Sequence, residues 1–325
     1  MSVNNLVKHF PVSGGPAFWK RNSEPVVVHA VDGVSFEIRP KESFGLVGES
    51  GCGKTTMAKI MARLLRPTSG EVVFSNADIF RARGDELKSI RRDISFVFQN
   101  PLSSMNPRWK IADILALPYR IHKITPKNQI VNRVRELLSD VELSPPERYM
   151  DRYPHELSGG ERQRVVIARA LALKPKFVIA DEPVASLDIS VRGKVLNMMK
   201  NLQSQFGLTY LIITHDLNVL HAMCDRVAVM YLGKVVEIGP VDEIFSDPRH
   251  PYTKALLRSR MIANPVQTRA RPITALEGEV PSPLHPPIGC RFNTRCPSRV
   301  ESCFKEEPRL APVGSDHDAA CPVLN

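Results

Sequence analysis

Eight consecutive residues have the types and spacing that could hold a phosphate group. The run fits the pattern G-x-x-x-x-G-K-[ST], follows an apolar stretch and precedes a helical one. Glycines let backbone N–H groups fold around phosphates, and the N-terminus of the next helix adds partial positive charge. We expect Lys54 to reach the β- and γ-phosphates of a nucleotide and Thr55 to ligate Mg²⁺. The predicted nucleotide-binding residues are Gly48, Glu49, Ser50, Gly51, Cys52, Gly53, Lys54, Thr55 and Thr56.

Two carboxylates, Asp181 and Glu182, end the apolar run that begins at Phe177. A buried strand would deliver Asp181 to the Mg²⁺ shell and place Glu182 to polarise a water for in-line attack on the γ-phosphate. A strand followed by a solvated acidic turn would read the same. The phosphate-binding pattern upstream favours the catalytic interpretation.

The run Leu157-Ser158-Gly159-Gly160-Glu161 opens a further helical stretch. Ser158 and Glu161 form a capping-box pattern, which by itself requires only a well-capped helix. The two consecutive glycines leave the helix N-terminus bare, and a bare N-terminus suits a second anion-binding site.

The elements that position these residues alternate along the chain. Apolar runs rich in β-branched residues recur between amphipathic stretches, which predicts an α/β core with a largely parallel sheet. The expected strands are 34–38, 44–47, 94–98, 177–180, 210–214 and 227–231. The expected helices are 55–65, 127–139, 159–173, 191–206 and 217–223.

The order of the motifs resembles that of the ABC transporter ATPases over roughly residues 1–245. Besides the segments above, the resemblance rests on Gln99, within Phe96–Pro101, and on His215. It implies a P-loop NTPase domain of the ABC type, with a RecA-like core, a helical subdomain at about residues 100–172 and N-terminal antiparallel strands.

The same resemblance assigns roles to the site residues. Each ATP is expected between the phosphate loop of one subunit and the Ser158–Gly160 segment of the other. Gln99, with Thr55 and Asp181, is expected at the Mg²⁺, where it senses the water and faces the membrane partner. His215 is expected to contact the γ-phosphate and support Glu182. Phe10 resembles the aromatic residue that stacks on adenine, although an ordinary core phenylalanine is the alternative.

One segment departs from the family pattern. After the two carboxylates the family usually has Ser-Ala-Leu-Asp, whereas this chain has Ala185 followed by the dimer-loop residues Ser186, Leu187 and Asp188. The departure puts in doubt the usual cross-dimer contact from the first of these positions.

Further segments resemble the ATPase subunits of dipeptide and oligopeptide permeases. They are residues 100–108, Pro248–Thr253, 278–283 and Gly289–Phe292. The resemblance implies a peptide importer with a second, related ATPase subunit, two transmembrane permease subunits and an extracytoplasmic substrate-binding protein. Nickel or glutathione import by the same ATPase is the alternative.

Four of the six cysteines gather near one end, at Cys290, Cys296, Cys303 and Cys321. A reducing compartment argues against disulfides. Proline-rich residues 260–325 cannot build an apolar core, so we predict a small extension ordered by a metal or a neighbouring surface, beside an ATPase domain at 1–259. The spacing leaves Zn²⁺, a [4Fe–4S] cluster or no metal open. The family resemblance favours iron–sulfur, with a structural or regulatory role outside hydrolysis.

Composition narrows the class further. The net charge is +10, but the basic residues are scattered among acids without stacking aromatics, so we expect no nucleic-acid partner. A soluble ABC ATPase acting on nucleic acid is the less favoured alternative, since its coiled-coil insertion has no room between Lys54 and Ser158. No apolar run nears the ~18 residues of a membrane span, and the start lacks a signal-peptide pattern. We expect a peripheral protein at the cytoplasmic face of the inner membrane.

Overall fold

The computed structural model describes residues 1–12, 26–258 and 278–324, and the chain forms two compact units. The first unit comprises Met1–Ile38, Phe44–Phe80 and His215–Asn325. The second comprises Arg39–Ser43 and Arg81–Thr214. In both units, apolar side chains that are fully removed from water form the core.

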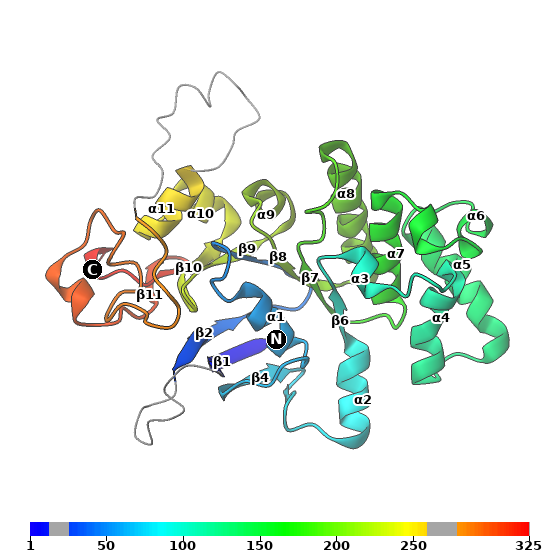
Figure 1. Cartoon of the computed structure of the whole chain (residues 1–325), viewed down its shortest axis with the longest axis horizontal. Helices are drawn as coiled ribbons and strands as arrows, with labels where there is room; N and C mark the ends of the chain where they lie inside the picture. The colour runs from blue at the N-terminus through cyan, green and yellow to red at the C-terminus, as the bar shows by residue number, and fades with distance from the viewer. Residues whose placement is uncertain (13–25, 259–277, 325) are drawn as a thin grey trace. The chain divides into compact units, whose positions relative to one another are not determined.

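A four-stranded antiparallel sheet lies in the first unit, with strands in the order β2-β1-β4-β5 (Figure 1, blue to cyan). The long strands β1 and β2 place His9 opposite His29. Val3 and Leu6 of β1 are buried, so one face of the sheet packs on the core. The strands are β1 (Ser2–Pro11), β2 (Val27–Glu37), β4 (Ser69–Phe74) and β5 (Ala77–Asp78).

The other strands of the first unit run in the order β11-β12-β10-β9-β3. Only the β3–β9 pair is parallel among the pairs of this group. The bounds are β3 (Ser43–Val47), β9 (Arg226–Tyr231), β10 (Lys234–Pro240), β11 (Ala311–Gly314) and β12 (His317–Ala319). The helices of this unit are α1 (Lys54–Met61), α9 (Leu217–Met223), α10 (Val241–Ser246) and α11 (Pro251–Arg258).

The second unit contains three parallel strands in the order β6-β7-β8. They are β6 (Ile94–Val97), β7 (Phe177–Asp181) and β8 (Thr209–Ile213), and the last two are buried at every residue, as expected for parallel strands covered on both faces. The helices are α2 (Gly84–Asp93), α3 (Pro101–Ser104), α4 (Ile111–His122), α5 (Ile130–Asp140), α6 (Glu147–Met150), α7 (Gly159–Leu171) and α8 (Ile189–Phe206). Figure 1 shows α4, α5 and α7 packed against one another.

Each predicted element overlaps an observed one, with three corrections. The strand expected at 34–38 is the end of β2, which begins at Val27. The helix expected at 55–65 ends at Met61, because Arg63 takes a left-handed φ of 56°. The helix expected at 127–139 starts with a 3-10 turn and becomes α-helical at Ile130. Strand β1 was missed because Asn4 and Asn5 interrupt its apolar alternation, and its pairing with β2 is irregular there.

Two further expectations meet limits in this structure. The predicted domain boundary at 259 and 260 lies outside the described residues, and the division stays a prediction. No helix of residues 1–12, 26–258 and 278–324 combines the length and apolar character that crossing a membrane requires.

Candidate nucleotide site and cysteine cluster

The phosphate-loop residues lie between β3 and α1 in the first unit. Two of the glycines are required by close approach of neighbouring backbone. A Cβ on Gly48 would lie 2.1 Å from the Met230 carbonyl oxygen, and one on Gly53 would lie 2.1 Å from that of Ala30. Gly53 also has a φ of 108°, which L side chains rarely adopt. These contacts hold the loop in a tight turn whose other residues can present backbone N–H groups.

Lys54 is buried inside the loop that it follows. Its Nζ donates to the carbonyl oxygens of Gly48 at 2.8 Å and Glu49 at 2.9 Å. Cys52 Sγ lies 3.6 Å from the same Nζ. Burial raises the pKa of the Cys52 thiol, with Lys54 opposing this effect, so the thiol beside Lys54 stays neutral near pH 7. The loop therefore surrounds one cation at the N-terminus of a helix, which suits an anionic ligand.

The remaining residues of the loop face outward to different degrees. Ser50, Gly51 and Thr55 are exposed, and Thr56 is half-buried. The N-terminus of α1 has no side-chain cap, so its first amides lack a protein side-chain acceptor at that position. Phe10 lies half-buried on β1 with the Lys8 ammonium 4.9 Å from its ring centre. A half-buried ring can offer a face to a base, so the adenine interpretation stays a prediction.

The second unit brings Gln99, Asp181 and Glu182 to one edge of a parallel sheet. Gln99 follows β6, Asp181 ends β7 and Glu182 comes next, and parallel strands end at the same edge. Asp181 is buried, Glu182 is half-buried and Gln99 is exposed. Three side chains with oxygen atoms that can ligate a metal ion or accept a proton thus gather at this edge, and their exposure to solvent increases from Asp181 to Gln99.

Glu182 is held in an uncommon backbone conformation. Its φ is 51°, and its N–H donates to the Ile213 carbonyl at the end of β8 over 2.8 Å. Thr214 Oγ1 donates to Glu182 Oε2 over 3.2 Å. A left-handed residue of this type is strained and typical of functional sites. The bond to Ile213 of β8 holds the Glu182 backbone, and the bond from Thr214, the residue after β8, orients the carboxylate.

The Leu157–Glu161 segment forms the capping box that the sequence predicts. Glu161 N–H donates to Ser158 Oγ at 3.3 Å, and Ser158 N–H donates to Glu161 Oε2 at 2.8 Å. Leu157 is buried while Ser158 is exposed, with both glycines half-buried. A Cβ on Gly160 would lie 2.5 Å from Val191 Cγ1 of α8, so this glycine also serves packing.

The dimer-loop residues lie between β7 and α8. Leu187 is buried, whereas Ser186 and Asp188 are exposed. The Arg192 side chain of α8 donates to the Leu187 carbonyl at 2.7 Å and to the Ala185 carbonyl at 3.3 Å. The conformation of this loop therefore depends on backbone bonds more than on the side chain at position 185.

His215 belongs to the first unit and is exposed. It immediately precedes Asp216, whose Oδ1 accepts from the Asn218 N–H at 2.9 Å and caps α9. The cap holds the backbone of Asp216, the residue next to His215.

The structure gathers the four cysteines in the first unit, and all four are buried and free. Cys290 N–H donates to the Cys303 carbonyl at 2.8 Å. Burial raises the pKa of Cys290 to about 11 and also raises those of Cys296 and Cys321, with the neighbouring thiols adding to it. No three of these sulfurs lie within 4.8 Å of one another. Cys290, Cys296 and Cys321 are therefore disfavoured as thiolates unless a cation compensates.

Sequence reasoning missed three residues at the phosphate loop. Glu49 N–H donates to Tyr252 Oη at 2.9 Å, and the Glu49 carboxylate pairs with Arg295. Tyr231 Oη lies 3.3 Å from the same guanidinium. Tyr252 stands within the predicted Pro248–Thr253 segment, but nothing local gave it a role. Arg295 stands one residue before Cys296 and carries no pattern of its own.

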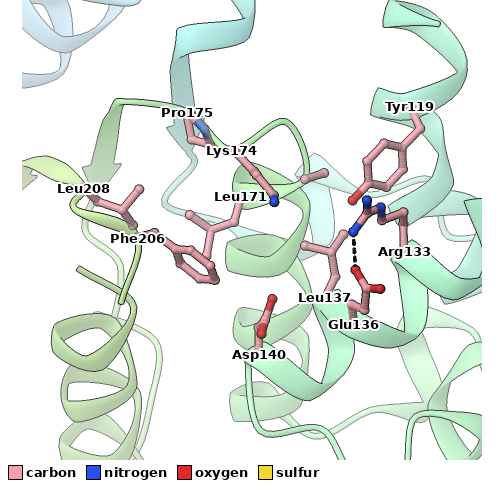
Figure 2. Close-up of a pocket in the computed structure, with 11 residues that line it drawn as sticks. Tyr119, Arg133, Glu136, Leu137, Asp140, Leu171, Lys174, Pro175, Phe206 and Leu208 are labelled. Atoms are coloured by element: carbon pink, nitrogen blue, oxygen red, sulfur yellow. Dashed lines mark hydrogen bonds and ion pairs between the residues drawn. The ribbon is translucent and has the colours of Figure 1, made fainter. Parts of the chain in front are cut away.

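A separate hollow of about 130 Å³ lies in the second unit, away from these motifs (Figure 2). Its polar groups include the Arg133–Glu136 ion pair at 2.7 Å and Tyr119, whose pKa burial raises to about 12. Phe206 and Leu208 close its other side. None of the predicted site residues lines this hollow.

The fold and the loop at Gly48–Thr55 define a P-loop nucleotide-binding protein of mixed α/β architecture. The family model described as "ABC transporter" matches residues 31–185. The model described as "Oligopeptide/dipeptide transporter, C-terminal region" matches residues 236–303.

Full-length relatives and solved structures agree with these matches. The chain is 43% identical to the oligopeptide transport ATP-binding protein AppF of Bacillus subtilis, over 99% of this chain and 96% of that protein. It is 43% identical to the oligopeptide transport ATP-binding protein OppF of Salmonella typhimurium, over 95% and 92%. An ATP-binding cassette solved as a dimer in a post-hydrolysis state with ADP and Pi is 31% identical, with a TM-score of 0.64 over 74% of this chain and 98% of that one. The chain belongs to the ABC transporter family and is an ATPase.

Proposed function

We propose that this chain is the ATP-hydrolysing subunit of a membrane importer that takes up di- or oligopeptides. The observation that carries the proposal is the pair of family matches, a cassette at 31–185 followed by a peptide-transporter region at 236–303. The full-length relatives whose names specify oligopeptide transport support the same substrate class. The chain acts at the cytoplasmic face of the inner membrane, with its membrane contacts supplied by partner subunits.

The nucleotide phosphates bind the loop at Gly48–Thr55. Lys54 supplies a buried ammonium, the uncapped N-terminus of α1 supplies amides, and Thr55 supplies a hydroxyl for Mg²⁺. Phe10 supplies a ring for the adenine. The contacts between Lys54 and the loop carbonyls support this role, because they keep the ammonium beside the backbone that surrounds the phosphates.

Hydrolysis uses the residues at the edge of the β6-β7-β8 sheet. Asp181 and Gln99 would hold Mg²⁺, which would offset charge on the phosphates, and Glu182 would accept a proton from the water that attacks the γ-phosphate. His215 contacts the γ-phosphate and supports Glu182. The fixed direction of the Glu182 carboxylate supports its assignment, since a general base must keep its orientation through the reaction.

The N-terminus of α7 binds the ATP held by a second, related ATPase subunit. The exposed Ser158 and the glycines behind it are available to such a partner. The dimer loop, Ser186 to Asp188, lies beside the helix whose Arg192 holds its backbone. Because Ala185 lacks a hydroxyl, any cross-dimer hydrogen bond at this position is made by the backbone. Two permease subunits and an extracytoplasmic binding protein complete the importer.

The four cysteines hold a [4Fe–4S] cluster with a structural or regulatory role. The burial of all four thiols and the mutual influence of their charges support a bound cation at this place. The family resemblance, and not the spacing of the cysteines, favours the cluster over zinc.

Co-purification from membranes tests the transport proposal. We expect the chain to be recovered with a second ATPase, two permeases and a peptide-binding protein, and the assembled complex to hydrolyse ATP faster when peptide is supplied. A nickel- or glutathione-binding protein in the complex would replace the substrate class but keep the importer. Recovery with nucleic acid and no permease would overturn the proposal.

Anaerobic purification tests the cluster. We expect brown protein with broad absorbance near ~400 nm and about four iron and four sulfide per chain. Cys296→Ser should remove the colour and make residues 280–324 more sensitive to protease. One zinc per colourless chain would replace the cluster by zinc, and four freely titrating thiols would exclude both.

A further inference from the structure

Glu49 places a carboxylate in the proposed phosphate loop. Its backbone and its side chain each contact another residue of the protein. Its N–H donates to Tyr252 Oη at 2.9 Å. Its two carboxylate oxygens accept from Arg295, at 2.9 Å to Nη1 and 3.3 Å to Nη2. The Arg295 side chain is 6% exposed and that of Glu49 25% exposed, so this pair is largely shielded from solvent. A two-pronged, shielded ion pair fixes geometry far better than a surface pair does.

The residues around Arg295 form a compact aromatic group. The rings of Tyr231, Tyr252 and Phe292 lie 4.7 to 5.5 Å apart, and the guanidinium carbon of Arg295 lies 5.9 Å from the Tyr231 ring centre. Burial raises the pKa of Tyr231 and Tyr252, so both remain neutral phenols. Phe292 and Arg295 both come from the short segment between Cys290 and Cys296. The Cys290–Cys296 segment therefore contacts the phosphate loop through these packed aromatic side chains and Arg295.

A second arginine on the same segment provides another anchor. Arg291 donates to Asp32, which lies beside His9 and His29. Atoms of these three groups lie within 4.8 Å of one another, a spacing that a metal ion could use. Burial would raise the pKa of Asp32, but Lys234, Arg291 and His9 outweigh it and lower the pKa. Positive groups of the protein thus already compensate the negative charge of Asp32. Asp32, together with His9 and His29, therefore holds the Arg291 side chain in place.

The charge of Glu49 explains why its partner matters for nucleotide. An unpaired carboxylate at this position would repel the phosphates that the loop binds. Arg295 neutralises this carboxylate. The Glu49 N–H donates to Tyr252 Oη, and this bond holds the Glu49 backbone, whose carbonyl accepts from Lys54 at 2.9 Å. A shift of Glu49 would therefore change the electrostatic potential that the phosphates meet and would also move the Lys54 ammonium.

We propose that Arg295 is a positioning residue for the phosphate loop, and that the Cys290–Cys296 segment sets nucleotide affinity through the Arg295–Glu49 pair. The proposal rests on the assignment of Gly48–Thr55 as the phosphate loop. Ordering of the cysteine segment places Arg295 on Glu49 and favours nucleotide binding. Loosening of the segment leaves Glu49 unpaired and weakens it.

Titration of Mg-ATP onto the full-length chain measures the pair. Arg295→Met keeps the apolar stem and should raise the Kd for ATP about 5- to 30-fold, as for loss of a charge-assisted contact. The rise should be smaller for ADP, which carries less negative charge. Arg295→Lys should recover part of the affinity. The matched control is Arg299→Met, which alters an exposed arginine four residues along and should leave Kd unchanged.

The double variant separates positioning from general damage. Glu49→Gln removes the charge that Arg295 neutralises, so adding Arg295→Met to it should cost less than threefold. Cys296→Ser should likewise weaken ATP binding in the natural sequence but not in the Glu49→Gln chain. Unchanged affinity of folded Arg295→Met, or equal losses in both backgrounds, would overturn the proposal. The loop assignment itself would fail separately, through unchanged ATP affinity of Lys54→Ala.

Discussion

Two helices of this chain have a glycine at or just before their first residue and are proposed to bind the same ligand, yet their N-termini are built differently. The helix α1 starts at Lys54 behind Gly53, with no side-chain cap. The helix α7 starts at Gly159 behind Ser158, whose capping box with Glu161 is complete. The first amides of α1 have no side-chain cap, whereas at α7 the Ser158 hydroxyl already accepts from the Glu161 N–H.

The difference suits the two separate roles that we propose for these helix N-termini. A bare N-terminus with a buried cation gains most from a bound anion, so α1 suits tight binding within one subunit. A capped N-terminus is stable without ligand and keeps its shape on an exposed surface. The α7 N-terminus can therefore keep its structure until the nucleotide of a partner subunit binds.

The largest expected effect comes from Glu182, the general base that we propose. Glu182→Gln should lower turnover of the assembled complex about 100- to 10,000-fold, because the amide cannot accept the proton of the attacking water. ATP binding should persist, and the variant should accumulate as an ATP-bound dimer in size-exclusion chromatography. Turnover near the natural rate would remove Glu182 from the mechanism.

Opposite substitutions at the two termini should separate their roles. Lys54→Ala should raise the Kd of the isolated chain for ATP about 10- to 100-fold, through loss of a charge-assisted contact. Ser158→Arg should leave that Kd within about twofold, yet prevent dimer formation and turnover. Equal loss of affinity in both variants, measured by nucleotide titration, would end the distinction between the two helices.

The cap itself should account for a smaller effect on stability. Ser158→Ala removes the acceptor for the Glu161 N–H and should lower the unfolding free energy by about 1 kcal/mol. Ser158→Asn, which can cap the same amide, is the matched control and should remain near the natural value. Urea unfolding measures both, and equal stability of the alanine variant would show that the box contributes nothing.

The smallest effect concerns the support of the α1 loop. Burial lowers the pKa of His250 to about 3, and its Nδ1 accepts from the Tyr252 N–H at 3.1 Å. Since the unfolded chain takes up a proton near pH 6.5 and the folded one does not, stability is full above that pH and falls as acid is added. Between pH 7.5 and 6.0 the loss should be about 0.8 kcal/mol.

The control for the acid effect is His250→Gln, which cannot titrate. The pH dependence of its urea midpoint should be flatter than that of the natural chain by this amount. Parallel pH profiles for the two chains would show that His250 is not the group responsible.

The sequence predicted the parts of the site that consist of contiguous runs. The β3-loop-α1 order and the Ser158–Glu161 box follow from local chemistry, and the structure confirms both arrangements. The Glu49–Arg295 pair joins residues 246 positions apart, and no local pattern marks either member. The left-handed φ of Glu182 was hidden for a similar reason, because bonds from β8 impose it.

The separation of 246 residues between Glu49 and Arg295 also bears on how the protein is made. At about 5–20 residues per second, the ribosome delivers Arg295 roughly 12–50 s after Glu49. The early loop thus emerges with an unpaired carboxylate and cannot reach its final arrangement during that interval. Contacts of such long sequence separation form late in folding. By the inference above, a nascent chain therefore binds nucleotide more weakly until the cysteine segment has been synthesised.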